Sequence, residues 1–120
     1  MVEHCVGPLG VGTLIVKPKR HVLHVADLRD DEAAELGPLL RRTTAAVTEA
    51  FEPEQIYVCL WSHADGVPSH IHWVVQPAAA SDDPARRGPQ LQAAMFARGE
   101  LRDPAAVERA ATTIRAVLRG

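Results

Sequence analysis

The stretch that most constrains this chain runs from Ser69 to Pro77 and reads Ser-His-Ile-His-Trp-Val-Val-Gln-Pro. Its β-branched and aromatic residues, followed by a proline, predict a β-strand that ends at Pro77. Side chains alternate between the two faces of a strand. One face is wholly apolar and belongs against a core: Ile71, Trp73 and Val75. The other face carries His70, His72, Val74 and Gln76. Its two imidazoles, about 7 Å apart at Cα, predict a site for a substrate or a metal ion.

Length and composition indicate one ordinary globular domain. The chain has 120 residues, of which 47% are hydrophobic and 23% charged, and its net charge is −2. This balance gives no electrostatic reason to expect a nucleic acid or a membrane surface as a partner. No apolar run approaches the roughly 20 residues of a membrane span, and the N-terminus has no signal-peptide pattern. Cys5 and Cys59 form no disulfide framework, so we expect a cytoplasmic protein with free thiols.

The remainder of the chain predicts strands in hairpins together with several helices. Strands are expected at Val2–Val6, Thr13–Lys17 and Gln55–Trp61. The polar loop Ser62–Pro68 returns the last of these into the histidine stretch as an antiparallel hairpin. Helices are expected at Asp27–Phe51, with a kink or a restart at Gly37-Pro38, at Gln90–Ala97, and from Asp103-Pro104 to about Leu118. This layout is typical of the α+β class.

Two charged segments flank the start of the long helix. A basic cluster surrounds Pro18 and consists of Lys17, Lys19, Arg20 and His21. It fits either a solvated turn or an edge that contacts phosphate. An acidic run, Asp30, Asp31 and Glu32, suits the cap and first turn of the helix, where the helix dipole favours negative charge.

Two chemistries fit a pair of histidines on one strand. Both imidazoles could bind one metal ion, but the remaining ligands would have to come from His63, His21, His24 or a cysteine, none at a diagnostic spacing. Alternatively, a neutral imidazole nitrogen can attack phosphorus and form a phosphoramidate that water later cleaves. That chemistry needs the other ring nitrogen held by a hydrogen bond and donors around the phosphate oxygens. The sequence favours the second chemistry and predicts no metal or other cofactor.

The histidine stretch resembles the histidine triad (HIT) motif, His-φ-His-φ-His-φ-φ, with Val74 in the third position. Upstream, the run Gly-Thr-Leu-Ile-Val-Lys-Pro-Lys-Arg-His, from Gly12 to His21, is also similar to the family. So is the continuation through Asp27-Leu28 into the acidic turn of the long helix. The two segments occur in the family's order, and the resemblance covers roughly residues 4–77.

The resemblance implies an α+β HIT-like fold and usually a homodimer. We expect a single domain over residues 1–120, with a motif-bearing core at 1–77 and a C-terminal helical extension at 78–120. The implied activity is hydrolysis or nucleotidyl transfer at the α-phosphate of a nucleotide conjugate, such as a dinucleoside polyphosphate or a nucleoside phosphoramidate. His72 matches the family's nucleophile and His70 its supporting histidine. The candidate substrate-binding residues are His21, Ser62, His63, Ser69 and Gln76.

The chain departs from the family pattern at three positions. Val74 cannot donate the hydrogen bond of a third histidine, although a related branch carries glutamine there. Cys5 falls where the family has an acidic residue that contacts ribose, and Thr13 replaces the usual histidine after Gly12. The alternative function is therefore a HIT-fold protein that binds a nucleotide or phosphate and has lost turnover.

Overall fold

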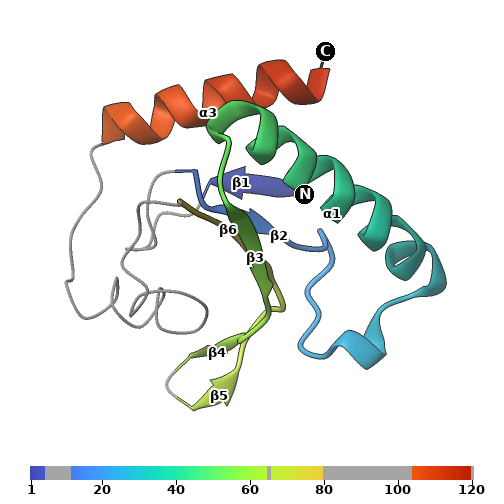
Figure 1. Cartoon of the computed structure of the whole chain (residues 1–120). Helices are drawn as coiled ribbons and strands as arrows, with labels where there is room; N and C mark the ends of the chain where they lie inside the picture. The colour runs from blue at the N-terminus through green and yellow to red at the C-terminus, as the bar shows by residue number, and fades with distance from the viewer. Residues whose placement is uncertain (5–11, 65, 80–103, 120) are drawn as a thin grey trace.

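The computed structural model describes residues 1–4, 12–64, 66–79 and 104–119 (Figure 1). Within these residues, a four-stranded antiparallel sheet has the order β1-β2-β6-β3. Its strands are β1 (Val2–His4), β2 (Leu14–Val16), β6 (Trp73–Ala78) and β3 (Gln55–Cys59). A small hairpin of β4 (His63–Ala64) and β5 (Val67–Pro68) joins β3 to β6. The α+β class is confirmed, and strands form at the three predicted places. Strand β2 is one residue shorter than predicted at each end, and β3 ends at Cys59 instead of Trp61. Residues 5 and 6 of the first predicted strand lie outside the described residues.

Strand β6 lies between β2 and β3. The predicted start at Ser69 is wrong, because β6 begins at Trp73, so that His70 and His72 precede the strand; at its other end it continues one residue further than expected. Val75 pairs with Leu14 on one side and with Val58 on the other. The predicted strand end at Pro77 is wrong, because Pro77 pairs with Ile56 and the strand ends at Ala78. The described pairing of β2 with β6 stops at Val75. A proline is tolerated there because it has a neighbouring strand on one side only.

Helix α1 (Asp30–Phe51) is one uninterrupted helix of 22 residues that contains Pro38. The predicted start at Asp27 is wrong, because Val25–Asp27 forms a separate 3-10 turn, η1. The predicted restart at Pro38 is wrong as well, since a proline removes one hydrogen bond and the rest of the ladder continues past it. The helix ends at Phe51, and the residue that caps it, Glu52, has left-handed backbone angles (φ 47°, ψ 52°) and donates its N–H to the Thr48 carbonyl.

The core lies between one face of the sheet and the two described α-helices (Figure 1). Its buried members are Leu14, Val16, Ala46, Val47, Val75 and Ile114. Helix α3 (Pro104–Arg119), close to its predicted bounds, contributes Ile114 and packs beside α1. The helix predicted at Gln90–Ala97 lies outside the described residues. Neither α1 nor α3 is long and apolar enough to cross a membrane.

Candidate active site around His72

His72 lies just before β6 and is anchored by two oxygen atoms. Its main-chain N–H donates to Ser62 Oγ at 3.1 Å. Its ring Nδ1 is 3.1 Å from the His70 carbonyl oxygen and 3.5 Å from Ser62 Oγ. Because a carbonyl oxygen can only accept, Nδ1 carries the proton and donates to it. The neutral ring therefore has its lone pair on Nε2.

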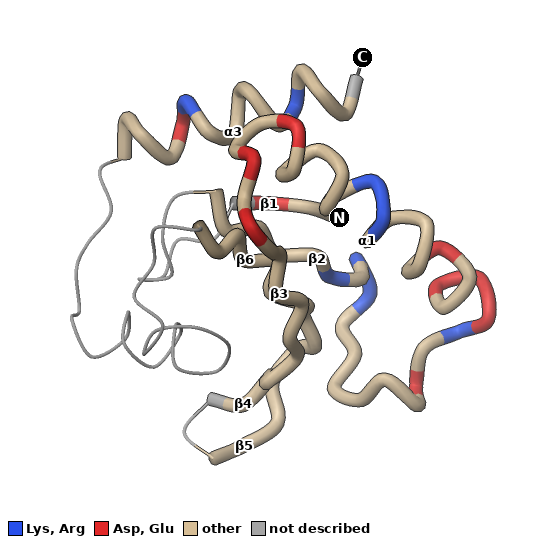
Figure 2. The backbone as a smooth tube through the Cα atoms, viewed as in Figure 1, with Lys and Arg blue, Asp and Glu red and all other residues tan. Residues whose placement is uncertain are grey.

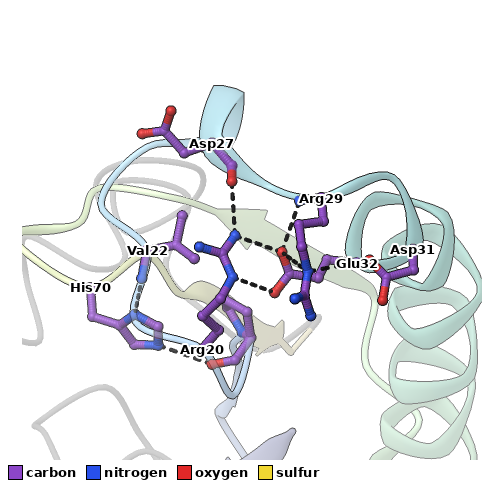
Figure 3. Close-up of polar contacts among 8 residues, drawn as sticks. Arg20, Val22, Asp27, Arg29, Asp31, Glu32 and His70 are labelled. Atoms are coloured by element: carbon purple, nitrogen blue, oxygen red, sulfur yellow. Dashed lines mark hydrogen bonds and ion pairs between the residues drawn. The ribbon is translucent and has the colours of Figure 1, made fainter.

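His70 is held at both ring nitrogens by the segment that follows β2 (Figure 3). The Val22 N–H donates to His70 Nδ1 at 3.1 Å, so the proton of the neutral ring is on Nε2, which donates to the Pro18 carbonyl at 3.0 Å. The Val22 carbonyl in turn accepts the Ile71 N–H at 2.8 Å. The ring of His21 stacks on that of His70, with centroids 5.2 Å apart and an interplanar angle of 18°.

These bonds bear on the metal alternative. Binding of one ion by His70 and His72 together would require His70 to give up one of its two main-chain partners. In the described part of the chain, no group of three or more His, Cys, Asp or Glu side chains is placed to hold a metal ion.

The structure brings several of the predicted site residues together. Ser62 and Ser69 lie at the base of the β4–β5 hairpin, where the Ser69 N–H donates to the Ser62 carbonyl at 2.9 Å. This bond fixes the backbone that presents Ser62 Oγ to His72. His21 joins the group through its stacking on His70. His63 lies in β4 with an exposed side chain.

Strand β6 is buried on both faces, including the position that replaces the third histidine. Trp73 and Val75 pack towards α1 in the core. On the other face Val74 is 6% exposed and Gln76 is fully buried. The side chain at the third position is therefore apolar and buried, and it cannot donate a hydrogen bond.

Arg20 and Glu32 join helix α1 to the Pro18–Val22 segment, which holds the His70 ring. The sequence does not reveal this contact. Arg20 donates two hydrogen bonds to the Glu32 carboxylate, from Nη2 to Oε1 at 2.7 Å and from Nε to Oε2 at 3.3 Å. Arg20 Nη2 also donates to the Asp27 carbonyl at 2.8 Å. The Arg29 main-chain N–H donates to Glu32 Oε1 at 2.8 Å. The hydrogen bonds from Arg20 and then Arg29 lower the pKa of Glu32 to about 2.

The sequence places Arg20 in a basic cluster and Glu32 in an acidic helix turn, without pairing them. The chain turns back through η1 (Val25–Asp27), so that Arg20, four residues after β2, contacts Glu32 in the first turn of α1. Figure 2 shows the basic segment after β2 and the acidic start of α1 on the same side of the molecule. The available signal is the presence of opposite charges on either side of one short turn.

A cavity of about 360 Å³ lies beside the Arg20–Glu32 contact, between α1 and the sheet. Val16, Leu36, Leu39 and Trp73 supply its apolar lining, and Arg20 and Glu32 also line it. His70, His72 and Ser62 are not among the lining residues. The cavity is therefore separate from the histidine site.

Comparison with known proteins gives matches among solved structures. No family model and no curated protein matches the chain. A Hit-like protein involved in cell-cycle regulation from Bartonella henselae is 18% identical, with a TM-score of 0.72, over 97% of this chain and 78% of that one. A hypothetical histidine triad nucleotide-binding protein from Sulfolobus tokodaii is 18% identical, with a TM-score of 0.74, over 98% and 76%.

A third structure of the same kind is a Zn-bound histidine triad family protein from Mycobacterium smegmatis. It is 20% identical, with a TM-score of 0.67, over 98% of this chain and 76% of that one. Sequence identities this low establish the shared architecture alone. The arrangement of strands and helices described above is therefore the HIT fold, and the chain has the fold of the histidine triad proteins.

Proposed function

We propose that this protein is a hydrolase or nucleotidyl transferase that acts at the α-phosphate of a nucleotide conjugate through a covalent bond to His72. The observation that carries the proposal is the contact between His72 Nδ1 and the His70 carbonyl at 3.1 Å. Because Nδ1 donates there, Nε2 has the lone pair that a nucleophile needs.

The reaction has two displacement steps at one phosphorus atom. In the first, the Nε2 lone pair of His72 forms a bond to the α-phosphorus while the bond to the leaving group breaks. The leaving group departs with the bonding electrons and takes a proton from water. In the second, water or another acceptor attacks phosphorus and gives up its proton to solvent, while the N–P bond breaks and returns its electrons to Nε2. Hydrolysis releases a nucleoside monophosphate.

The surroundings of His72 support this assignment. The Ser62 hydroxyl and the His70 carbonyl hold the main chain and ring of His72 from two sides, which is the outer support that a reactive imidazole needs. The fold agrees, since one structural neighbour is described as a histidine triad nucleotide-binding protein. His21, Ser62, His63 and Ser69 remain the proposed substrate contacts, whereas Gln76 is fully buried and lies beneath the surface that a substrate could reach.

Intact-protein mass spectrometry tests the proposal. Purified protein is incubated with adenosine 5′-phosphoramidate or diadenosine tetraphosphate and quenched in conditions that preserve phosphoramidates. We expect an adenylyl adduct on His72, together with release of AMP. His72→Ala should abolish both, while His24→Ala, which alters an exposed histidine that is not a proposed substrate contact, should retain the adduct. Adduct formation that survives His72→Ala would contradict the proposal.

The buried valine at the third position favours a second candidate function, binding without turnover. Val74 is 6% exposed and cannot stabilise the leaving group by a hydrogen bond. In that case AMP would raise the melting temperature of the protein, and neither probe would yield an adduct or a product. The same experiment thus separates the two candidates.

We also propose a homodimer, in which β3, at one edge of the sheet formed by the described residues, is the contact. Strand β3 is the last strand in the described sheet order. Val58 on this strand is 43% exposed, and Phe51 just before it is 39% exposed. An exposed apolar edge strand is prone to pair with a second chain. Light scattering should give twice the monomer mass, and Val58→Lys should shift it towards the monomer. A monomeric wild-type protein at micromolar concentration would refute this.

A further inference from the structure

The two histidines are connected to helix α1 by polar contacts that are joined through the main chain of the Pro18–Val22 segment. Arg20 lies between Pro18 and Val22, the two residues whose main-chain groups hold the His70 ring. The carbonyl of His70 accepts the proton of His72 Nδ1. Each of these contacts therefore orients the next, and the last is made by the ring assigned as nucleophile.

The Arg20–Glu32 contact is suited to fix the Pro18–Val22 segment. Its two parallel hydrogen bonds define an orientation as well as a distance. The Glu32 side chain is 13% exposed, and that of Arg20 is 41% exposed. The Arg20 guanidinium also donates to the Asp27 carbonyl, and the Glu32 carboxylate also accepts the Arg29 main-chain N–H. A lysine at position 20 could supply the positive charge, but it could not donate two parallel hydrogen bonds to the Glu32 carboxylate as the guanidinium does.

We infer that Arg20 and Glu32 are positioning residues, which set the ring orientation and tautomer of His70 and, through its carbonyl, those of His72. The inference rests on the proposed function for its effect on rate, but its effect on the histidine rings is independent of any reaction. Neither residue touches the reacting atoms. Supporting partners of this kind change activity by about 10–100-fold in metal sites, and we expect the same range here.

Arg20→Lys is the main test, with Arg29→Ala as the matched control. Arg29 approaches the same carboxylate from the helix side, and its main-chain N–H bond to Glu32 is retained in the alanine variant. Histidine side-chain ¹⁵N–¹H correlation spectra report the tautomers without substrate, at about pH 8, where an ordinary imidazole is neutral. Wild-type protein should show His70 protonated at Nε2 and His72 protonated at Nδ1.

In Arg20→Lys, we expect His70 to become a mixture of the two tautomers. With adenosine 5′-phosphoramidate as the probe, the turnover rate should fall about 10–100-fold while KM changes less than about twofold. Arg29→Ala should retain the wild-type spectrum and rate. Glu32→Gln serves as a second variant in case Arg20→Lys fails to fold, because glutamine keeps one acceptor oxygen for Arg20.

Two results would overturn the inference. One is a folded Arg20→Lys or Glu32→Gln variant with both tautomers unchanged. The other is an equal effect of Arg29→Ala, which would indicate general disturbance of the helix start. If wild-type protein forms no adduct, the proposed function fails, and the tautomer spectra still decide the positioning role.

Discussion

Replacing Ser62 by alanine removes the hydroxyl that accepts the His72 main-chain N–H at 3.1 Å. Ser62 is 8% exposed, so the His72 main-chain N–H, left without its acceptor, has limited access to water. A buried donor without a partner costs about 1–3 kcal/mol. Because His72 is only half-buried, we expect the lower part of that range, about 1–2 kcal/mol of unfolding free energy. The same loss loosens the anchor of the His72 ring, so adduct formation should slow about tenfold.

Urea unfolding followed by circular dichroism measures the first effect, and the mass-spectrometric adduct rate measures the second. Ser69→Ala is the matched control for the stability measurement, because its main-chain bond to the Ser62 carbonyl is retained in the variant. Ser62→Thr restores a hydroxyl and should recover part of the lost stability. If Ser62→Ala unfolds at the same urea concentration and with the same slope as wild type, the Ser62–His72 bond contributes nothing and the reasoning is wrong.

Three further predictions concern stability. The stability difference between wild type and Glu32→Gln should be largest above about pH 4.5 and shrink as the pH falls towards 2, because Arg20 lowers the folded-state pKa of Glu32 to about 2; a difference that stays constant in urea unfolding from pH 6 to pH 3 would contradict this. Glu52→Gly should stabilise the protein by about 1 kcal/mol in thermal unfolding, since Glu52 has a φ of 47°; a lower melting temperature would show that the glutamate side chain is needed. Gly12→Ala should cost about 1–2 kcal/mol in urea unfolding, because Gly12 has a φ of +92° and an added Cβ would lie 3.2 Å from the Phe51 ring. Gly66 has a φ of +76°, and a Cβ added there would meet no heavy atom of the described residues within 4 Å apart from its chain neighbours. Gly66→Ala therefore measures the backbone part alone, and an equal loss in both variants would mean that Phe51 moves aside.

The elements that the sequence predicts best are those specified by local patterns. The β-branched run Thr13–Lys17 and the apolar spacing of the long helix depend on near neighbours, and both elements form close to the predicted bounds. The strand end at Pro77 is missed because a proline is tolerated where only one neighbouring strand is present, and sequence alone does not give strand order. The histidine pair is visible in the sequence as a motif.

The chemistry of the site depends on contacts that no local pattern encodes. The tautomers of His70 and His72 follow from the carbonyls of Pro18 and His70 and from the N–H of Val22, which are main-chain groups present in every sequence. The pairing of Arg20 with Glu32 needs the η1 turn between them. These features become predictable only when the path of the chain is known.

The link between Arg20 and Glu32 also has a consequence for the order of folding. It joins residues 12 apart in sequence, whereas the bonds from His70 to Val22 and Pro18 join residues 48 and 52 apart. Closing the longer loop costs about 1.3 kcal/mol more in chain entropy. We expect the Pro18–Val22 segment to pack against α1 before β6 pairs with the sheet. Substitution of Arg20 should then slow folding, while substitution of His70 should mainly speed unfolding. The main-chain groups that bind the His70 ring would then be in place before the segment that carries His70 reaches them.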